Sequence, residues 1–199
     1  AMIQAALYQA GGGKGNDIEI TVSGRSDRGI ATELFEINDL PDTEDNWERF
    51  VELYVANLRT NLLQREGTIL PGVQRLLDEL LELEGTALGL LTGNLQVAAQ
   101  MKLEHFGLNH YFDFGGYGDR CRQRDDIARE AELSARDHLD HCYDPALTWV
   151  IGDTPNDVRC ARAIGANAVA VATGIYSFEE LETVRPDYCL HDLSDTEEF

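Results

Sequence analysis

The sequence is poor in basic residues and has no long apolar run. Sixteen lysines and arginines stand against 36 aspartates and glutamates, which gives a net charge of −20 at pH 7. A surface of that charge repels phosphate backbones and anionic lipids, so we expect no nucleic-acid partner and no membrane attachment. The best apolar run, 168–172, is far shorter than the roughly 20 residues of a membrane helix. Residues 1–20 also lack a basic start followed by an apolar block, so we expect no secretory signal peptide.

Cysteines are few and widely spaced. The chain has four of them, and no two form the Cys-x-x-Cys spacing typical of redox and zinc sites. A chain of 199 residues can bury an apolar core without disulfides. We therefore expect reduced thiols and a cytoplasmic protein, and the sequence leaves open whether it is a monomer or a homodimer.

Two regions differ in their hydrophobic pattern, and we place the boundary between them after residue 66. Residues 1–66 are predicted to form an α-helical cap domain, with helices over 28–37 and 43–64. Residues 67–199 alternate short apolar strands with helices, which is typical of a Rossmann-like α/β domain with a parallel sheet and helices on both faces. The expected strands are 87–91, 112–115, 147–151, 168–172 and 188–190. One helix is expected to begin at Pro71, and three further helices are expected at 95–106, 125–139 and 155–164.

A glycine-rich stretch, 11–15, superficially suggests a phosphate-binding loop. Its lysine, Lys14, is followed by Gly15 instead of serine or threonine, and no apolar strand precedes it. A turn is therefore the favoured interpretation.

Ligands of such sheets bind beyond the carboxyl ends of the strands, and a first candidate site is Thr92-Gly93-Asn94, which follows the strand predicted at 87–91. A threonine hydroxyl and free backbone N–H groups at a helix start form a small anion site. Simple helix capping by Thr92 or Asn94 is the alternative, and for this motif alone it is favoured.

The second candidate site, 152–157, has the sequence Gly-Asp-Thr-Pro-Asn-Asp after the strand predicted at 147–151. Asp153 and Asp157 lie four residues apart across a strand–helix corner, which suits a hard cation such as Mg²⁺. A capping box formed by Thr154 and Asp157 is the alternative. Because that box leaves Asp153 unexplained, metal binding is favoured.

Three arginines, Arg120, Arg122 and Arg124, stand just before the helix predicted at 125–139. In so acidic a chain they form a local positive cluster, and one of them could neutralise a phosphate. A solvated surface is the better interpretation for Arg120 and Arg122.

In this order the three motifs resemble the haloacid dehalogenase superfamily, in particular its phosphoglycolate-phosphatase-like members with a helical cap. The similarity covers about residues 70–190 and includes the segments 161–166 and 171–174, whereas 1–66 resembles the cap only loosely. The resemblance implies Mg²⁺-dependent hydrolysis of a small phosphate monoester, a small phosphorylated metabolite, through an aspartyl-phosphate. Dehalogenation is less favoured, because that reaction uses no metal ion and would not explain two acidic residues at the corner formed by 152–157.

The resemblance also implies roles for residues that would contact the phosphate. Thr92, with the backbone of Gly93 and Asn94, would bind the transferring phosphoryl group. Arg124 would stand in for the lysine that is usual in the family and stabilise charge on the nucleophile and the phosphate. Arg122 is the alternative register for that role.

Further roles concern the metal and the cap. By resemblance, Asp153 would ligate Mg²⁺ directly, and Asp157 would support the ion directly or through water. The cap, through Arg25 as a phosphate-binding residue and Asp27, would close over the site and select the substrate.

One element of the family pattern is missing. The family nucleophile belongs to an Asp-x-Asp-Gly-Thr motif at the end of a first, central strand, and no such motif precedes residue 25 here. In the family that strand lies between the strands that here end at Thr92 and Asp153. Met2 behind Ala1 looks like a start codon behind the remnant of an expression tag, so we expect roughly 15–25 native residues upstream of Met2.

Two alternatives to an enzyme stay open. Because the nucleophile is missing, the chain is also compatible with a catalytically inactive relative that binds a phosphate or a partner. A phosphorylation-dependent receiver domain shares an acidic Mg²⁺ site and a parallel sheet, but the length and the helical first third disfavour it.

Overall fold

The computed structural model describes residues 20–64, 67–140 and 142–194. The glycine-rich stretch 11–15 and Met2 lie outside these ranges, and with them the interpretations that rest on these residues.

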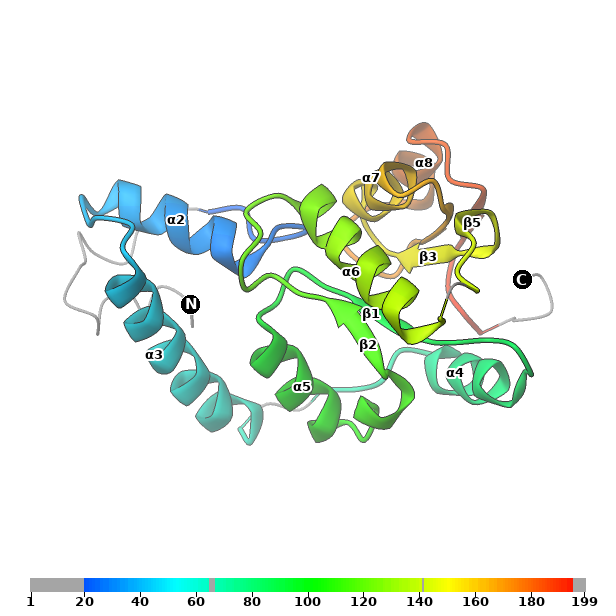
Figure 1. Ribbon diagram of the computed structural model, residues 1–199, viewed down its shortest axis with the longest axis horizontal. Helices are drawn as coiled ribbons and strands as arrows, with labels where there is room; N and C mark the ends of the chain where they lie inside the picture. The colour runs from blue at the N-terminus through cyan, green and yellow to red at the C-terminus, as the bar shows by residue number, and fades with distance from the viewer. Residues whose placement is uncertain (1–19, 65–66, 141, 195–199) are drawn as a thin grey trace.

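The described chain begins with two helices, α2 (Asp27–Ile37) and α3 (Glu44–Leu62), which lie together at one end of the molecule (Figure 1). Each helix starts at a side-chain cap. Ser26 accepts a hydrogen bond from the Gly29 N–H at 3.0 Å, and Thr43 accepts one from the Asn46 N–H at 3.3 Å. Such caps satisfy amides that have no partner inside the helix. The helices predicted at 28–37 and 43–64 are thus confirmed within one or two residues at each end.

The rest of the chain alternates strands and helices, which confirms the predicted α/β class. In chain order the elements are α4 (Val73–Glu82), β1 (Gly89–Leu91), α5 (Gln96–His105), the 3₁₀ turn η1 (Asn109–Tyr111), β2 (Phe114–Gly116), α6 (Arg124–His138), the 3₁₀ turn η2 (Pro145–Leu147), β3 (Trp149–Gly152), α7 (Pro155–Ala163), β4 (Asn167–Val171), α8 (Phe178–Thr183) and β5 (Tyr188–Leu190).

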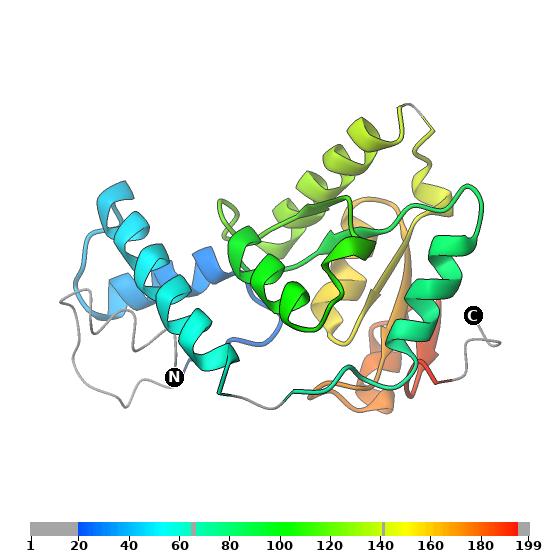
Figure 2. The ribbon, with the colours of Figure 1, turned by 90° about the horizontal axis from the view of Figure 1, so that it is seen from below.

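The strands form two parallel sheets. In one, β1 pairs with β2; in the other, β4 lies between β3 and β5. Helices α6 and α7 lie on one side of the strands, and α4 and α5 lie on the other (Figures 1 and 2). Within the described residues no ladder joins β1 to β3, and the β3 side chains Trp149 and Ile151 are 41% and 37% exposed. The parallel order matches the prediction, whereas the absence of a central strand stays a prediction, because residues 1–19 lie outside the described ranges.

The main apolar cluster crosses the predicted domain boundary at residue 66. Aromatic rings of α3 stack in a row, with Phe50 centred 5.7 Å from Trp47 and 6.1 Å from Tyr54. This row packs with residues of α2 and with Leu95 and Ala98 at the start of α5. The division into a cap at 1–66 and a core at 67–199 stays a prediction, but α2 and α3 pack against the rest of the fold through α5.

Two helices differ from the sequence expectation. Helix α4 begins at Val73 and not at Pro71, because Gly72 adopts a left-handed conformation (φ 80°) that ends the preceding turn. Helix α8 was not predicted. It is six residues long, and its signal is a capping box in which the Ser177 hydroxyl accepts from the Glu180 N–H and the Glu180 carboxylate accepts from the Ser177 N–H.

The four cysteines are all free thiols, as expected. Among the helices of the described ranges, none combines the length and the apolar character of a membrane span.

The Asp187 carboxylate, which stands just before β5, accepts hydrogen bonds from α7 and β4 and should make the stability of the fold depend on pH. It accepts hydrogen bonds from Arg162 Nη1 and from the Ala168 N–H, each at 2.7 Å, and these bonds, the Arg162 bond first, lower the pKa of Asp187 below 3.8. Its stabilising effect is therefore present above about pH 4 and lost as the pH falls through the folded-state pKa. We expect Asp187→Ala to lower the free energy of unfolding by about 1 kcal/mol at pH 7. Urea unfolding should show that difference shrinking toward pH 3, and an equal difference at both pH values would contradict the assignment.

Candidate functional site

The corner between β3 and α7 holds the acidic motif 152–157. Thr154 is the N-cap of α7 and Pro155 its first residue. Asp157 Oδ2 accepts hydrogen bonds from the Thr154 backbone N–H at 3.0 Å and from the Thr154 hydroxyl at 2.8 Å. The two residues thus form a capping box, the alternative considered for this motif. Gly152 makes the close approach possible, because a side-chain carbon there would lie 2.4 Å from Asp157 Cβ.

The second oxygen of Asp157 pairs with Arg124, the first residue of α6. Arg124 Nη2 donates to Asp157 Oδ1, and the two side chains are only 10% and 12% exposed. The other guanidinium nitrogen, Nη1, lies 3.1 Å from the point that a side-chain carbon on Gly93 would occupy. Arg124 therefore connects the turn after β1 with the corner after β3.

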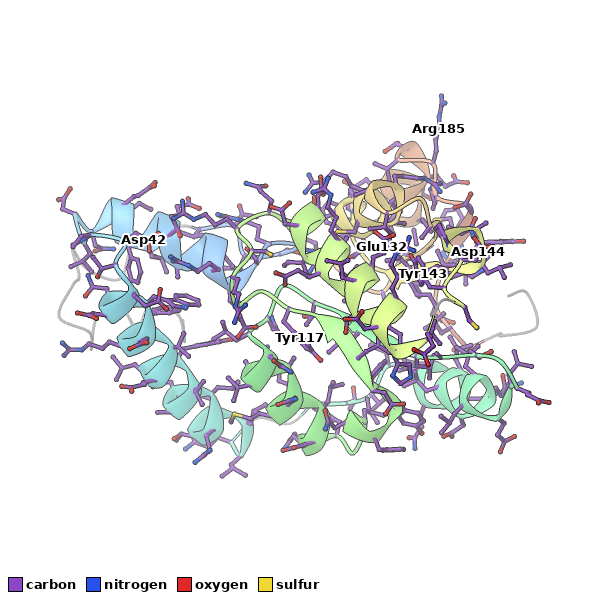
Figure 3. The ribbon with its side chains drawn as sticks, viewed as in Figure 1. Asp42, Tyr117, Glu132, Tyr143, Asp144 and Arg185 are labelled. Atoms are coloured by element: carbon purple, nitrogen blue, oxygen red, sulfur yellow. The ribbon has the colours of Figure 1, made fainter. Side chains whose placement is uncertain are left out.

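Arg122, the alternative for this role, lies elsewhere. Its side chain is 56% exposed and pairs at 2.7 Å with Asp42, which is labelled between α2 and α3 in Figure 3. Asp42 also accepts from Arg28 at 2.7 Å. Burial would raise the pKa of Asp42, but the bonds from Arg28 and Thr32 and the two arginine charges lower it. Arg122 thus links two surface segments, and only Arg124 stands at the strand ends.

Asp153 follows β3 directly and is partly exposed. Partial burial raises the pKa of Asp153 most, the charge of Asp157 raises it further, and the charge of Arg124 opposes both. On its other side Asp153 Oδ2 would lie 2.2 Å from a side-chain carbon on Gly174. Two carboxylates and one arginine therefore meet at this corner. Over the described ranges, no set of three or more histidine, cysteine or acidic residues is arranged to hold a metal.

The turn Thr92-Gly93-Asn94 follows β1 as predicted. The Thr92 N–H donates to the Gly116 carbonyl of β2 at 3.0 Å, and the Asn94 N–H donates to the Thr92 hydroxyl oxygen at 3.2 Å. The Gly93 N–H has no hydrogen-bond partner among the described residues. The turn therefore offers one unused amide and one hydroxyl hydrogen.

The first amides of α5 are not free, which corrects the expectation of several unused donors at this helix start. The Leu95 N–H donates to Asp27 Oδ2 at 2.9 Å, and the Gln96 N–H donates to Asp119 Oδ2 at 2.8 Å. Both carboxylates also sit at the positive end of the helix dipole. These contacts could not be predicted from the sequence, because they join residues 68 and 23 positions apart.

The Arg25 side chain lies against α2, the helix that begins two residues later. It pairs with Glu33 and donates to the Thr21 carbonyl at 3.1 Å. Only its backbone reaches the turn, where the Arg25 carbonyl oxygen would lie 2.1 Å from a side-chain carbon on Gly93. Phosphate binding by the Arg25 side chain stays a prediction, and no contact of the described chain brings that side chain to the turn.

Several known proteins are similar to this chain. "Probable phosphatase IndB" from Dickeya dadantii is 30% identical over 157 residues, which cover 78% of this chain and 66% of that protein. "Phosphoglycolate phosphatase" from Synechococcus elongatus is 31% identical over 129 residues, which cover 64% of this chain and 57% of that protein. The chain thus spans less than two thirds of the length of either relative.

Solved structures and a family model agree with these relatives. CbbY from Rhodobacter sphaeroides, crystallised in complex with phosphate, matches with a TM-score of 0.70 at 19% identity, covering 98% of this chain and 86% of that one. At that identity the match establishes a shared fold. A family model described as haloacid dehalogenase-like hydrolase matches residues 16–171. The chain therefore belongs to the haloacid dehalogenase-like hydrolase family.

Proposed function

We propose that this protein hydrolyses a small phosphate monoester with the help of Mg²⁺. The observation that carries the proposal is the position of Arg124. A buried arginine, paired with Asp157, lies beside the Gly93 turn and joins the two motifs that end β1 and β3. Fixed positive charge between a polar turn and an acidic corner is what phosphoryl transfer needs, because its catalysis is mainly positioning and charge stabilisation.

Three unused donors support phosphate binding at this place. They are the Gly93 N–H, the Thr92 hydroxyl hydrogen and Arg124 Nε, a buried nitrogen without a hydrogen-bond partner in the described part of the chain. A buried donor without a partner is costly, and a phosphate oxygen would satisfy it. We therefore assign the phosphoryl group to Thr92, Gly93 and Arg124, with Asn94 holding the threonine hydroxyl.

The acidic corner fits a hard cation with one direct carboxylate ligand. Asp153 is partly exposed, and partial burial together with the Asp157 charge makes its charged form less favourable, which a cation would reverse. Both Asp157 oxygens already accept hydrogen bonds, so this residue fits indirect support better than direct ligation. Mg²⁺ held by Asp153 would supply positive charge that offsets the charge of the phosphate.

A nucleophile is still required. We propose that it is an aspartate on a strand that would lie between β1 and β3, outside the residues that the structure describes. Among the described residues no strand pairs with the facing edges of β1 and β3, and Trp149 and Ile151 are exposed, which supports that position. The aspartate oxygen would attack phosphorus while the ester P–O bond breaks, and a second aspartate would give its proton to the leaving alcohol. Water would then attack the aspartyl-phosphate, releasing inorganic phosphate and restoring the carboxylate.

The name of one relative and the position of residues 24–28 support a small substrate. One relative is named for phosphoglycolate, and segment 24–28 lies directly against the Gly93 turn. We propose a small phosphorylated metabolite as the partner, handled by a monomer or homodimer.

Hydrolysis of p-nitrophenyl phosphate by the protein expressed from its complete gene tests the proposal. We expect turnover that EDTA abolishes and Mg²⁺ restores. Phosphate binding without turnover of this ester or of phosphoglycolate would favour the inactive phosphate-binding relative instead.

Gly174→Ala should lower activity without unfolding the protein. The new methyl group would lie 2.2 Å from Asp153 Oδ2, and the flexible Asp153 side chain can rotate away at little cost. That rotation would move the proposed metal ligand, so we expect kcat to fall by a factor of about 10 or more with the melting temperature nearly unchanged. The neighbouring Ile175→Ala, at a 74% exposed side chain, is the matched control and should retain full activity. An unchanged kcat for Gly174→Ala would contradict the role of Asp153.

A further inference from the structure

Residues 24–28, here called the docking segment, connect the cap helices to three strand ends. The Asp27 N–H donates to the Gly93 carbonyl at 2.6 Å, and the Arg28 N–H donates to the Gly118 carbonyl at 3.1 Å. The Gly24 carbonyl accepts from Asn156 Nδ2 in α7 at 2.7 Å. The docking segment therefore contacts the loops after β1 and β2 and the first turn of α7, which follows β3.

Asp27 makes the most demanding of these contacts. The residue is only 4% exposed, although it carries a carboxylate. Burial raises the pKa of Asp27, whereas the hydrogen bond from the Leu95 N–H and the charge of Lys102 lower it. Lys102 also donates to Asn94 Oδ1 at 2.6 Å. Burying a carboxylate whose charge is only partly stabilised by its neighbours lowers the stability of the fold, so the position of Asp27 points to a functional role.

The two Asp27 bonds fix two successive peptide planes of the turn. Its N–H holds the carbonyl of the Gly93–Asn94 peptide, and its carboxylate holds the N–H of the Asn94–Leu95 peptide. Glycine tolerates several backbone orientations, so the first of these planes is free to flip unless it is held from outside. A flip would break the bond from the Asn94 N–H to the Thr92 hydroxyl and would release that hydroxyl from its present orientation.

We infer that Asp27 is a positioning residue that holds the turn of residues 92–95 in the geometry that binds phosphate and ties that geometry to docking of α2 and α3. The inference rests on the phosphate site proposed above. It changes the role expected for Asp27, which acts on the turn from behind and does not contact the substrate.

The test is a titration of the ¹⁵N-labelled chain with inorganic phosphate in the presence of Mg²⁺, followed by NMR. We expect Asp27→Ala to raise the phosphate Kd about tenfold and to speed hydrogen exchange at the Asn94 and Leu95 amides. Asp27→Asn keeps the backbone donor and an acceptor oxygen, so it should restore the affinity to within about threefold of the unmodified chain.

Asp42→Asn is the matched control. It weakens another link between the cap helices and the strand-end loops, the bridge from Arg28 to Arg122, without touching residues 92–95. We expect an unchanged phosphate Kd, whereas a purely structural role of Asp27 would make both variants behave alike. Unchanged affinity and exchange in Asp27→Ala would overturn the inference alone. Failure of the unmodified chain to bind phosphate would overturn the proposed site and the inference together.

Discussion

Asp153→Asn is expected to abolish hydrolysis while leaving the protein folded. Asparagine keeps the shape of the side chain but removes the charge that would hold Mg²⁺, so we expect kcat to fall about 1000-fold or more. Stability should not fall, because partial burial and the Asp157 charge raise the pKa of Asp153 in the folded state. A raised pKa means that the charged carboxylate disfavours folding at neutral pH, and the neutral asparagine removes that effect.

The Asp153 experiment needs activity and stability measured on the same samples. Steady-state kinetics with p-nitrophenyl phosphate give kcat, and thermal unfolding without Mg²⁺ gives the melting temperature. Asp113→Asn, at an exposed aspartate before β2, is a matched control and should keep full activity. A variant at Asp153 that loses both activity and fold, or one that keeps its activity, would contradict the assignment.

Arg124→Ala is expected to destabilise the protein and to remove its activity. The change leaves the Asp157 carboxylate buried without its cation, and breaking a buried pair in this way costs about 3–5 kcal/mol. It also removes the positive charge beside the Gly93 turn, so any folded fraction should have lost phosphate binding. Urea unfolding at pH 7 measures the first effect, and a phosphate titration at low temperature measures the second.

Arg129→Ala separates the site from general charge effects. Arg129 lies in the same helix and pairs with Asp126, but both side chains are more than half exposed. Exposed pairs contribute little, so we expect a change of less than about 1 kcal/mol and unchanged phosphate affinity. Equal losses for the two arginine variants would show that the buried pair has no special role.

The acidic corner was predictable because its signals are local. Residues 152–157 can adopt few conformations, because the strand ends in Gly-Asp and is followed by a threonine N-cap and a proline at the first helical position. The structure has the expected strand–helix corner at these residues. A capping box with Asp157 was also the alternative interpretation of this sequence. What the sequence could not give is the partner of the second Asp157 oxygen, because Arg124 is 33 residues away and Arg122 stayed open as the alternative for its role. Arg124 takes this role because its side chain is buried, whereas that of Arg122 is exposed, and its burial depends on how α6 packs against α7.

The turn after β1 shows the opposite case. Thr92 and Gly93 were placed correctly at the strand end, but the amides expected to be free are held by Asp27 and Asp119. A cap that comes from the same helix start can be recognised from spacing, as at Ser177 in α8. A cap that comes from another part of the chain depends on tertiary packing, which no spacing records.

The central claim is that Thr92, Arg124 and Asp153 form one site for a phosphoryl group and a divalent ion. A crystal structure of this chain grown with Mg²⁺ and inorganic phosphate tests that claim most directly. We predict an anion within hydrogen-bonding distance of the Thr92 hydroxyl and the Arg124 guanidinium, with a cation on the Asp153 carboxylate. Phosphate bound elsewhere, or an ordered Asp153 with no cation at a saturating Mg²⁺ concentration, would contradict it.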